Sequence, residues 1–128
     1  MIVFTNGCFD VIHRGHLDLL KYCKSLGRVV VGINSDKSVK RLKGKSRPIN
    51  CSNDRKYLLE CLSFVDEVII FEEDTPYELI KKTKPDIIVK GGDYNPKNVV
   101  GNDLAEVRIF EIVEGYSTTL TIQNSIKS

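Results

Sequence analysis

Two histidines, His13 and His16, are the residues of this chain whose type and spacing most clearly suggest chemistry. They follow an apolar, strand-like start at Ile2–Thr5 and a turn-rich segment at residues 6–10. Residues three apart are neighbours on a helical turn, and Gly15 between them lets a ligand approach the backbone closely. Helix amides and two imidazoles aimed at one point make a site for an anion such as phosphate. The motif therefore predicts a protein that handles a nucleoside triphosphate.

Two other interpretations of the histidines compete with this one. His16 shares a helical face with Leu19 and Leu20, so it could be a packed core histidine. A zinc site would use Cys8 with His13 and His16, but a convincing fourth ligand and the usual zinc spacing are missing. The strand–turn–helix context favours phosphate binding over both.

Three further polar segments also follow predicted strands or precede a predicted helix. The basic stretch Lys40–Arg47 is either a solvated loop or a set of cations that closes over phosphates. Residues 90–93 form either a plain turn or a backbone surface for a nucleobase or ribose, with Asp93 accepting a hydrogen bond. Gly115–Thr119 puts three hydroxyls at a helix start, where they either cap the helix or present donors to a phosphate. Together with the histidine motif, these segments predict one shared crevice.

Hydrophobic periodicity predicts strands that alternate with helices. The strands are rich in valine and isoleucine, and several are apolar at successive positions, as in parallel strands covered on both faces. They are Ile2–Thr5, Arg28–Ile33, Glu67–Phe71, Asp86–Val89 and Val107–Ile112. We therefore predict a doubly wound, Rossmann-like α/β domain with a parallel five-stranded sheet and helices on both faces. In such sheets the ligand lies beyond the carboxyl ends of the strands.

The predicted helices carry recognisable start and stop signals. They begin near His13, at a cap on Ser52 or Asn53, near Thr75, and at a cap on Ser117. Gly27 is the expected C-cap of the first helix. Thr75 offers a capping hydroxyl, followed by Pro76 at the first helical position and Glu78 at the capping-box position. Residues 90–103 show no clear periodicity and are predicted to form a loop.

Bulk composition limits the classes of function. A length of 128 residues suits a single domain over residues 1–128. The net charge of +2, from 19 basic and 17 acidic side chains, is too balanced to predict binding to nucleic acid or membranes. No apolar run approaches the ~20 residues that span a bilayer, and the N-terminus looks like a core strand rather than a signal segment. The four cysteines form no C-x-x-C pair, so a reducing, cytoplasmic location is expected.

Taken in order, these motifs resemble those of the cytidylyltransferase-like nucleotidyltransferases, whose hallmark is a histidine–x–glycine–histidine motif near the N-terminus. Within that superfamily the chain most resembles the adenylyltransferase domain of the bifunctional heptose kinase/adenylyltransferase and its stand-alone equivalents. The resemblance covers nearly the whole chain. The matching segments are residues 6–10 with 13–16, 41–44 with 47–48, 71–76, 89–94, and 114–115 with 117–119.

The resemblance implies a reaction in which ATP and D-glycero-D-manno-heptose 1-phosphate give ADP-heptose and pyrophosphate. Mg²⁺ is the implied cofactor, held mainly by the nucleotide phosphates rather than by protein ligands. His13, His16 and Lys43 are the implied catalytic residues. The full set of predicted nucleotide-binding residues is Cys8, Phe9, Asp10, His13, Gly15, His16, Arg55, Gly91, Asp93, Ser117, Thr118 and Thr119. A homodimer is expected from the resemblance alone.

The chemistry of this reaction explains why no catalytic carboxylate or serine–histidine pair stands out. The attacking group is a phosphate monoester, whose second pKa of about 6 leaves it largely dianionic at neutral pH. No general base is required. We therefore expect catalysis by positioning and by charge stabilisation around the α-phosphorus and the departing pyrophosphate.

Two alternatives stay open. One is a CTP-dependent cytidylyltransferase that acts on glycerol 3-phosphate or another small phosphate. The glycerol-phosphate cytidylyltransferases carry an arginine three residues before the glycine of their final motif, where this chain has Ile112, which weighs against copying cytidine recognition. The other is a nucleotide-binding module without catalysis, which the intact His13, Gly15, His16 and Lys43 argue against.

Overall fold

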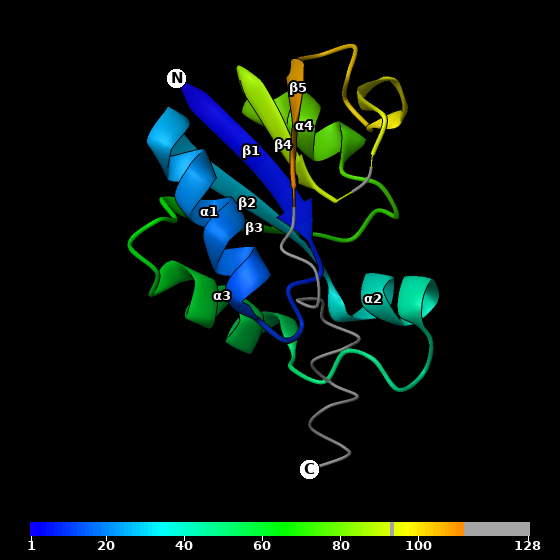
Figure 1. The fold of residues 1–128 in the computed structure, drawn as a ribbon. Coiled ribbons are helices and arrows are strands. Elements are labelled where there is room, and N and C mark those ends of the chain that lie inside the picture. Colours follow the sequence, from blue (N-terminus) through cyan, green and yellow to red (C-terminus); the bar gives the residue numbers. More distant parts are fainter. Residues whose placement is uncertain (93, 112–128) are drawn as a thin grey trace.

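Residues 1–92 and 94–111 are described by the computed structural model of the protein. They form a five-stranded, all-parallel sheet in the order β3-β2-β1-β4-β5 (Figure 1). The strands are β1 (Ile2–Gly7), β2 (Arg28–Asn34), β3 (Glu67–Phe71), β4 (Ile87–Gly91) and β5 (Glu106–Phe110). The helices are α1 (Arg14–Leu26), α2 (Asp36–Lys43), α3 (Ser52–Glu60), α4 (Tyr77–Thr83) and the short 3-10 helix η1 (Pro96–Asn98). The predicted parallel α/β sheet is confirmed.

The central strands are buried on both faces, as their continuous apolar runs predict. In β2, every residue from Val29 to Asn34 is buried. Strand β1 pairs with β2 in register from Ile2 opposite Arg28 to Gly7 opposite Ile33. The carboxyl ends of these two strands therefore stop at the same edge of the sheet.

Helices cover both faces of the sheet (Figure 1). On one face, α1 and α3 contribute Leu19, Leu20 and Leu59 to a core formed with alternate residues of the strands. On the other face, α4 contributes Leu79 and Ile80 to a second core. Each face of the sheet is therefore covered by its own helices and has its own hydrophobic core, as predicted for a doubly wound domain.

The order of the strands places a topological switch point between β1 and β4. From β1 the chain proceeds through α1 to β2 and on to β3, and it then crosses to the other side of β1 to form β4. Connections on either side of such a point leave in opposite directions, and a crevice opens beyond the carboxyl ends of the two strands. The histidine motif, which follows β1, begins at this crevice.

The helix boundaries differ from the prediction at several places. The basic stretch after β2 is not a loop throughout, because residues 36–43 form α2 with Ser35 as its cap. Helix α3 is capped by Cys51, without a side-chain capping bond, rather than by Ser52 or Asn53. Pro76 is itself the N-cap residue of α4, so the predicted capping role of Thr75 and the predicted place of Pro76 at the first helical position are both wrong.

Strand ends also shift by a few residues. Strand β4 extends to Gly91 instead of ending at Val89, so the predicted loop over residues 90–103 begins later and contains η1. Strand β5 covers Glu106–Phe110 instead of Val107–Ile112. The C-cap role of Gly27 is confirmed, because its backbone N–H donates to the carbonyl of Cys23. The helix predicted from Ser117 lies outside the described residues, as does part of the predicted single domain over residues 1–128.

No helix among residues 1–92 and 94–111 is long and apolar enough to cross a membrane.

Candidate active site

A cavity of about 210 Å³ lies at the switch point, beyond the carboxyl ends of β1 and β4. Its described lining residues are Asn6, Gly7, Cys8, Phe9, His16, Leu19, Lys43, Arg47, Lys90, Gly91 and Tyr94. They come from the turn after β1, the start of α1, the end of α2 and the end of β4. Three of the four predicted polar segments therefore share one cavity; residues 112–128, which hold the fourth, lie outside the described residues.

The two histidines cap the N-terminus of α1. His13 is the N-cap residue, and its Nδ1 accepts a hydrogen bond from the backbone N–H of Gly15 at 3.0 Å. His16 reaches back, and its Nδ1 accepts from the backbone N–H of His13 at 3.2 Å. The two rings stack with their centroids 3.9 Å apart. The spacing of the motif is thus that of a capping box, in which histidines replace the usual serine and glutamate.

This capping arrangement fixes the tautomers of both rings. Since Nδ1 accepts in each case, a neutral ring carries its proton on Nε2 and offers one N–H donor. Burial, with a smaller contribution from the neighbouring His13, lowers the pKa of His16 to about 4. Burial also lowers the pKa of His13. Both histidines are therefore neutral at neutral pH, and His16, which lines the cavity, supplies a hydrogen-bond donor rather than a positive charge.

Phe9 holds His16 in place. Its ring centroid lies 4.9 Å from that of His16, and its side chain is buried. To reach this position its backbone takes a φ of +48°, in the left-handed region that non-glycine residues rarely adopt. Gly7 makes room for the ring, because a Cβ at Gly7 would lie 3.1 Å from the Cε2 of Phe9. Backbone conformations of this kind concentrate at functional sites.

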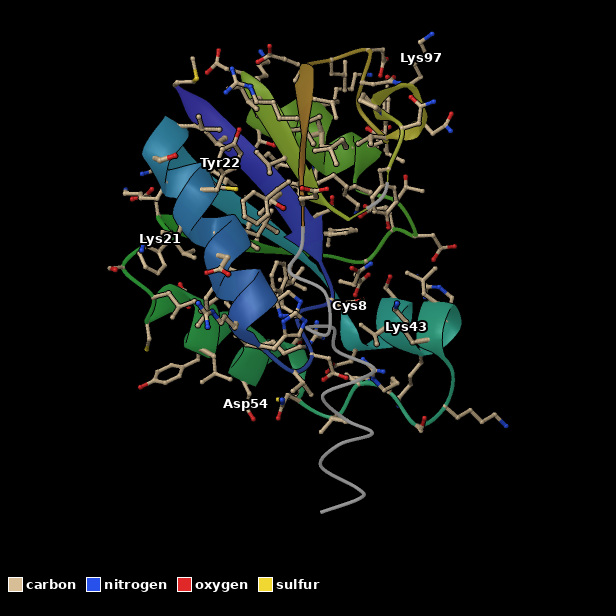
Figure 2. All side chains as sticks on the ribbon, in the orientation of Figure 1. Cys8, Lys21, Tyr22, Lys43, Asp54 and Lys97 are labelled. Carbon is tan, nitrogen blue, oxygen red and sulfur yellow. The ribbon has the colours of Figure 1, made fainter. Side chains whose placement is uncertain are left out.

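Three cations converge on the cavity from different elements. Lys43 is the last residue of α2, Arg47 follows four residues later, and Lys90 lies on β4. Figure 2 shows Lys43 and Cys8 together at this end of the sheet. The residues of the predicted basic stretch therefore have different roles. Lys43 and Arg47 line the cavity, whereas Arg41 donates to Asp74 and to the carbonyl of Glu72.

Asp10 anchors the segment that carries Arg47. Its side chain is fully buried, and its carboxylate accepts hydrogen bonds from the backbone N–H groups of Ile49 and Asn50. The carboxylate also forms an ion pair with Arg47, whose Nε lies 2.7 Å from Oδ2. Burial by itself would raise the pKa of Asp10, but the N–H donors of Asn50 and Ile49 and the guanidinium of Arg47 outweigh it and lower the pKa. The structure therefore gives Asp10 a positioning role, with its carboxylate used inside the protein rather than in the cavity.

Arg55 is also a positioning residue in this structure. Its side chain is completely buried and does not line the cavity. The guanidinium donates to the carbonyl of Cys8 at 2.8 Å, to the carbonyl of Asn50 at 3.0 Å and to Asp36 at 2.9 Å. Arg55 thus ties together the turns after β1 and β2 and the start of α3. Sequence reasoning placed it among the nucleotide-binding residues, whereas all three groups of its guanidinium have partners within the protein.

The other predicted residues fall into three groups. Cys8 and Gly91 line the cavity, and burial raises the pKa of the Cys8 thiol despite the nearby cations. Gly15 is buried, and its N–H is used in the helix cap. Asp93, Ser117, Thr118 and Thr119 lie outside the described residues.

Six described cavity residues were not among the predicted site residues: the polar or charged Asn6, Arg47, Lys90 and Tyr94, and the apolar Gly7 and Leu19. Lys90 is the most informative of them. Burial lowers the pKa of its ammonium, and the neighbouring Lys43 acts in the same direction. The ammonium lies 5.3 Å from the centroid of the Tyr94 ring, in cation–π range. The available sequence signal was the position of Lys90 at the end of a predicted strand.

In the part of the chain that the structure describes, neither a metal-ligand set nor the groove beside α4 competes with the cavity as a triphosphate site. Among residues 1–92 and 94–111, no three histidine, cysteine or acidic side chains form a set that could hold a metal ion. A groove of about 470 Å³ lies between β3 and α4, but three of its lining residues are the glutamates Glu72, Glu73 and Glu78. A polyanion would be repelled there and attracted to the cavity at the switch point.

Comparison with known proteins gives a consistent family. Residues 4–124 match the family model described as Cytidylyltransferase-like. The Bifunctional protein HldE of a Nitratiruptor species is 64% identical over 124 residues, which cover 95% of this chain and 27% of the relative. The protein of the same name from Sulfurimonas denitrificans is 58% identical over 95% of this chain and 26% of its own length. The chain therefore spans about a quarter of the length of these curated relatives.

A solved structure shares the fold over nearly its whole extent. It is described as the lipopolysaccharide core biosynthesis protein from Thermoplasma volcanium GSS1. The two chains are 32% identical and superpose with a TM-score of 0.73, covering 91% of this chain and 98% of the other.

Proposed function

The chain belongs to the cytidylyltransferase-like family and is a nucleotidyltransferase, and we propose that it transfers AMP from ATP to D-glycero-D-manno-heptose 1-phosphate. The products are ADP-heptose and pyrophosphate. The relatives named HldE, and the resemblance of the motifs to the heptose branch of the family, support this choice of substrates. We further propose a cytoplasmic homodimer that works in the synthesis of heptose-containing carbohydrates.

One observation carries the proposal: Lys43, Arg47 and Lys90 line a single cavity together with the neutral donor His16. Cations and neutral N–H donors in one partly buried site suit a triphosphate, whose charge is spread over many oxygens. The N-terminus of α1 faces the same region, and its first turn contains no acidic residue to oppose an anion.

The proposed reaction is an in-line displacement at phosphorus. An oxygen of the acceptor phosphate forms a bond to the α-phosphorus of ATP. The bond from that phosphorus to the oxygen bridging the α- and β-phosphates breaks, and this oxygen keeps the electron pair as pyrophosphate leaves. Because the acceptor arrives largely dianionic, no side chain has to remove a proton. The work of the site is to bring two anions together and to stabilise the departing charge.

The residues contribute to this in different ways. Lys43 and Arg47 neutralise the triphosphate as it binds. His13 and His16 donate through Nε2, as neutral hydrogen-bond donors that keep their proton throughout the neutral pH range. Asp10 and Arg55 hold the turns that carry these groups.

Mg²⁺ is the proposed cofactor, and the donor set fits an ion that arrives with the nucleotide. Asp10, which directly follows the cavity residues Cys8 and Phe9 in the chain, has its carboxylate occupied by protein donors. Oxygen ligands from phosphates and water suit Mg²⁺, which commonly binds through substrate phosphates. When bound, the ion would neutralise phosphate charge.

A matrix of nucleotides against acceptors tests the proposal. ATP and CTP are each incubated with both anomers of the heptose 1-phosphate and with glycerol 3-phosphate, and pyrophosphate release is measured with Mg²⁺. We expect release with ATP and one anomer of the heptose phosphate. Pyrophosphate release with CTP and not with ATP would show that the protein is a cytidylyltransferase and would overturn the proposal. ATP binding without release from any acceptor would indicate a binding module.

A further inference from the structure

A second hollow of about 160 Å³ adjoins the triphosphate cavity. The two share Asn6, Lys90 and Tyr94 as a common wall. The rest of the second hollow is formed by Pro76, at the start of α4, and by residues 98–100, which include the end of η1. The hollow therefore lies on the β4 side of the switch point and opens next to the three cations.

The two hollows differ in their chemistry. The triphosphate cavity is lined by three cations, whereas Lys90 is the one charged residue among the described lining of the second hollow. Its other polar side chains are Tyr94, with its hydroxyl, and the amides of Asn6 and Asn98, which can each donate and accept hydrogen bonds. Pro76 and Val99 are buried and supply apolar surface. Amides set in apolar surface, with one cation at the edge, suit a hydroxyl-rich molecule that carries a single phosphate.

Lys90 occupies the boundary between the two hollows. Its stem is half-buried on β4 and its ammonium lies over the ring of Tyr94. Among residues 1–92 and 94–111, no carboxylate lies within ion-pair distance of this ammonium. A partly buried cation of this kind gains from an anionic ligand, because the ligand offsets the cost of removing the charge from water.

We propose that the second hollow is the acceptor subsite, and that it binds the polyhydroxyl part of a sugar or polyol phosphate. Lys90 holds the phosphate of this acceptor at the boundary, beside the α-phosphate of the nucleotide. This inference rests on the proposed function in one respect, that the acceptor is a phosphate monoester. It adds Lys90 and Asn98 as acceptor-binding residues.

Asn98→Leu tests the subsite without touching the triphosphate cavity. Asn98 is exposed and lines only the second hollow, so the variant is expected to fold. The matched control is Asn53→Leu, at an exposed position on α3 outside both hollows. Acceptor affinity is measured by calorimetry on protein saturated with α,β-methylene ATP, and the affinity for that analogue is measured separately. We expect Asn98→Leu to bind the acceptor roughly tenfold more weakly, with analogue affinity within twofold of the wild type.

Lys90→Met tests the boundary cation, with Lys97→Met as its control. Lys97 lies on η1, outside both hollows, and Figure 2 shows it pointing away from the rest of the protein. Lys90→Met is expected to weaken acceptor binding by roughly 10- to 100-fold, and to weaken the nucleotide analogue less. Lys97→Met should match the wild type in both.

The outcomes separate this inference from the proposed function. If Asn98→Leu binds the acceptor as tightly as Asn53→Leu does, the subsite is wrong. If Asn98→Leu weakens the nucleotide analogue as much as the acceptor, the hollow holds part of the nucleotide and the subsite is also wrong. The heptose assignment is tested separately, with the wild type: it is wrong if the protein uses glycerol 3-phosphate and neither anomer of the heptose 1-phosphate.

In that case the variants are compared with glycerol 3-phosphate as the acceptor. Unchanged acceptor affinity in Asn98→Leu, or an equal loss of analogue affinity, would again overturn the subsite. A wild type that binds the analogue but no sugar or polyol phosphate overturns the subsite directly.

Discussion

Replacing Asp10 with asparagine tests whether this carboxylate positions the segment that carries Arg47, without altering a side chain that lines the cavity. The carboxylate accepts from the backbone N–H groups of Ile49 and Asn50 and from the Nε of Arg47. All of these are donors, and an asparagine at the same place offers one acceptor oxygen and one NH₂ group. The NH₂ group would face donors, and the guanidinium of Arg47 would lose its counter-charge. Asp10→Asn therefore breaks a buried ion pair by removing one partner.

The expected cost is large for a substitution of nearly equal volume. Breaking a buried pair from one side costs about 3–5 kcal/mol, against a total stability of about 5–15 kcal/mol for a typical domain. In a chain of this length, that corresponds to a Tm lower by about 10–20 °C. Activity should fall as well, because Arg47 lines the cavity and depends on Asp10 for its position.

The pH dependence provides a second, independent signature. The folded protein lowers the pKa of Asp10, so the unfolded chain binds a proton first as the pH falls. The contribution of Asp10 is therefore present at pH values above its unfolded pKa of about 3.9 and is lost as the pH falls through the lower folded pKa. Asp10→Asn has no such group, so its stability should fall less steeply in this acidic range.

Urea unfolding followed by circular dichroism, repeated between neutral and acidic pH, measures both effects. Asp54→Asn is the matched control, because Asp54 is exposed on α3 and Figure 2 shows its side chain directed outward. The control should stay within about 1 kcal/mol of the wild type. An Asp10→Asn protein as stable as the control, with the same acid profile as the wild type, would refute the anchoring role of Asp10.

Four further predictions follow from the site. His16→Ala should lower kcat roughly 10²–10³-fold in pyrophosphate-release assays while ATP affinity, measured by calorimetry, changes little; equal losses in both would contradict a transition-state role. His16 should also make stability decrease as the pH falls from 6.5 towards about 4, since the unfolded chain takes up the proton first, and His16→Gln should flatten that part of the urea-unfolding profile. Arg55→Lys should lower Tm and kcat together, because one ammonium cannot replace three directed guanidinium bonds; lost ATP affinity at unchanged Tm would indicate nucleotide contact instead. EDTA should abolish pyrophosphate release until Mg²⁺ is restored, without changing the Tm of the nucleotide-free protein.

The parts of the fold that depend on local pattern could be predicted from the sequence. The five strands are short, valine- and isoleucine-rich runs, and each was placed within two residues of its observed start. Helix α2 was missed because it is short and carries only two apolar side chains, Val39 and Leu42, among its eight residues. A usable signal was nevertheless present, since Ser35 caps the helix by accepting from the N–H of Ser38.

Where the site depends on tertiary arrangement, the sequence predicts which segments contribute to it but not which side chains face the ligand. The motif of His13 and His16 was found because its residues are adjacent on one helical turn. The resemblance placed Arg55 among the nucleotide-binding residues, and only the folded structure shows that its guanidinium donates to the carbonyls of Cys8 and Asn50 and to Asp36. A charged side chain has the same appearance in a sequence whether it faces a ligand or a buried carbonyl.

The division of charge in the cavity gives the histidine motif a different role from the one its composition suggests. A histidine is often taken as a source of positive charge near phosphate, yet burial and mutual contact keep His16 neutral. Positive charge comes instead from Lys43 and Arg47, at the end of α2 and on the turn after it, and from Lys90 on β4, which is far from both in the sequence. A neutral imidazole whose Nδ1 is occupied by a backbone N–H can only donate through Nε2. The capping box therefore does two things at once: it starts α1, and it aims a fixed donor at the place where the cations gather.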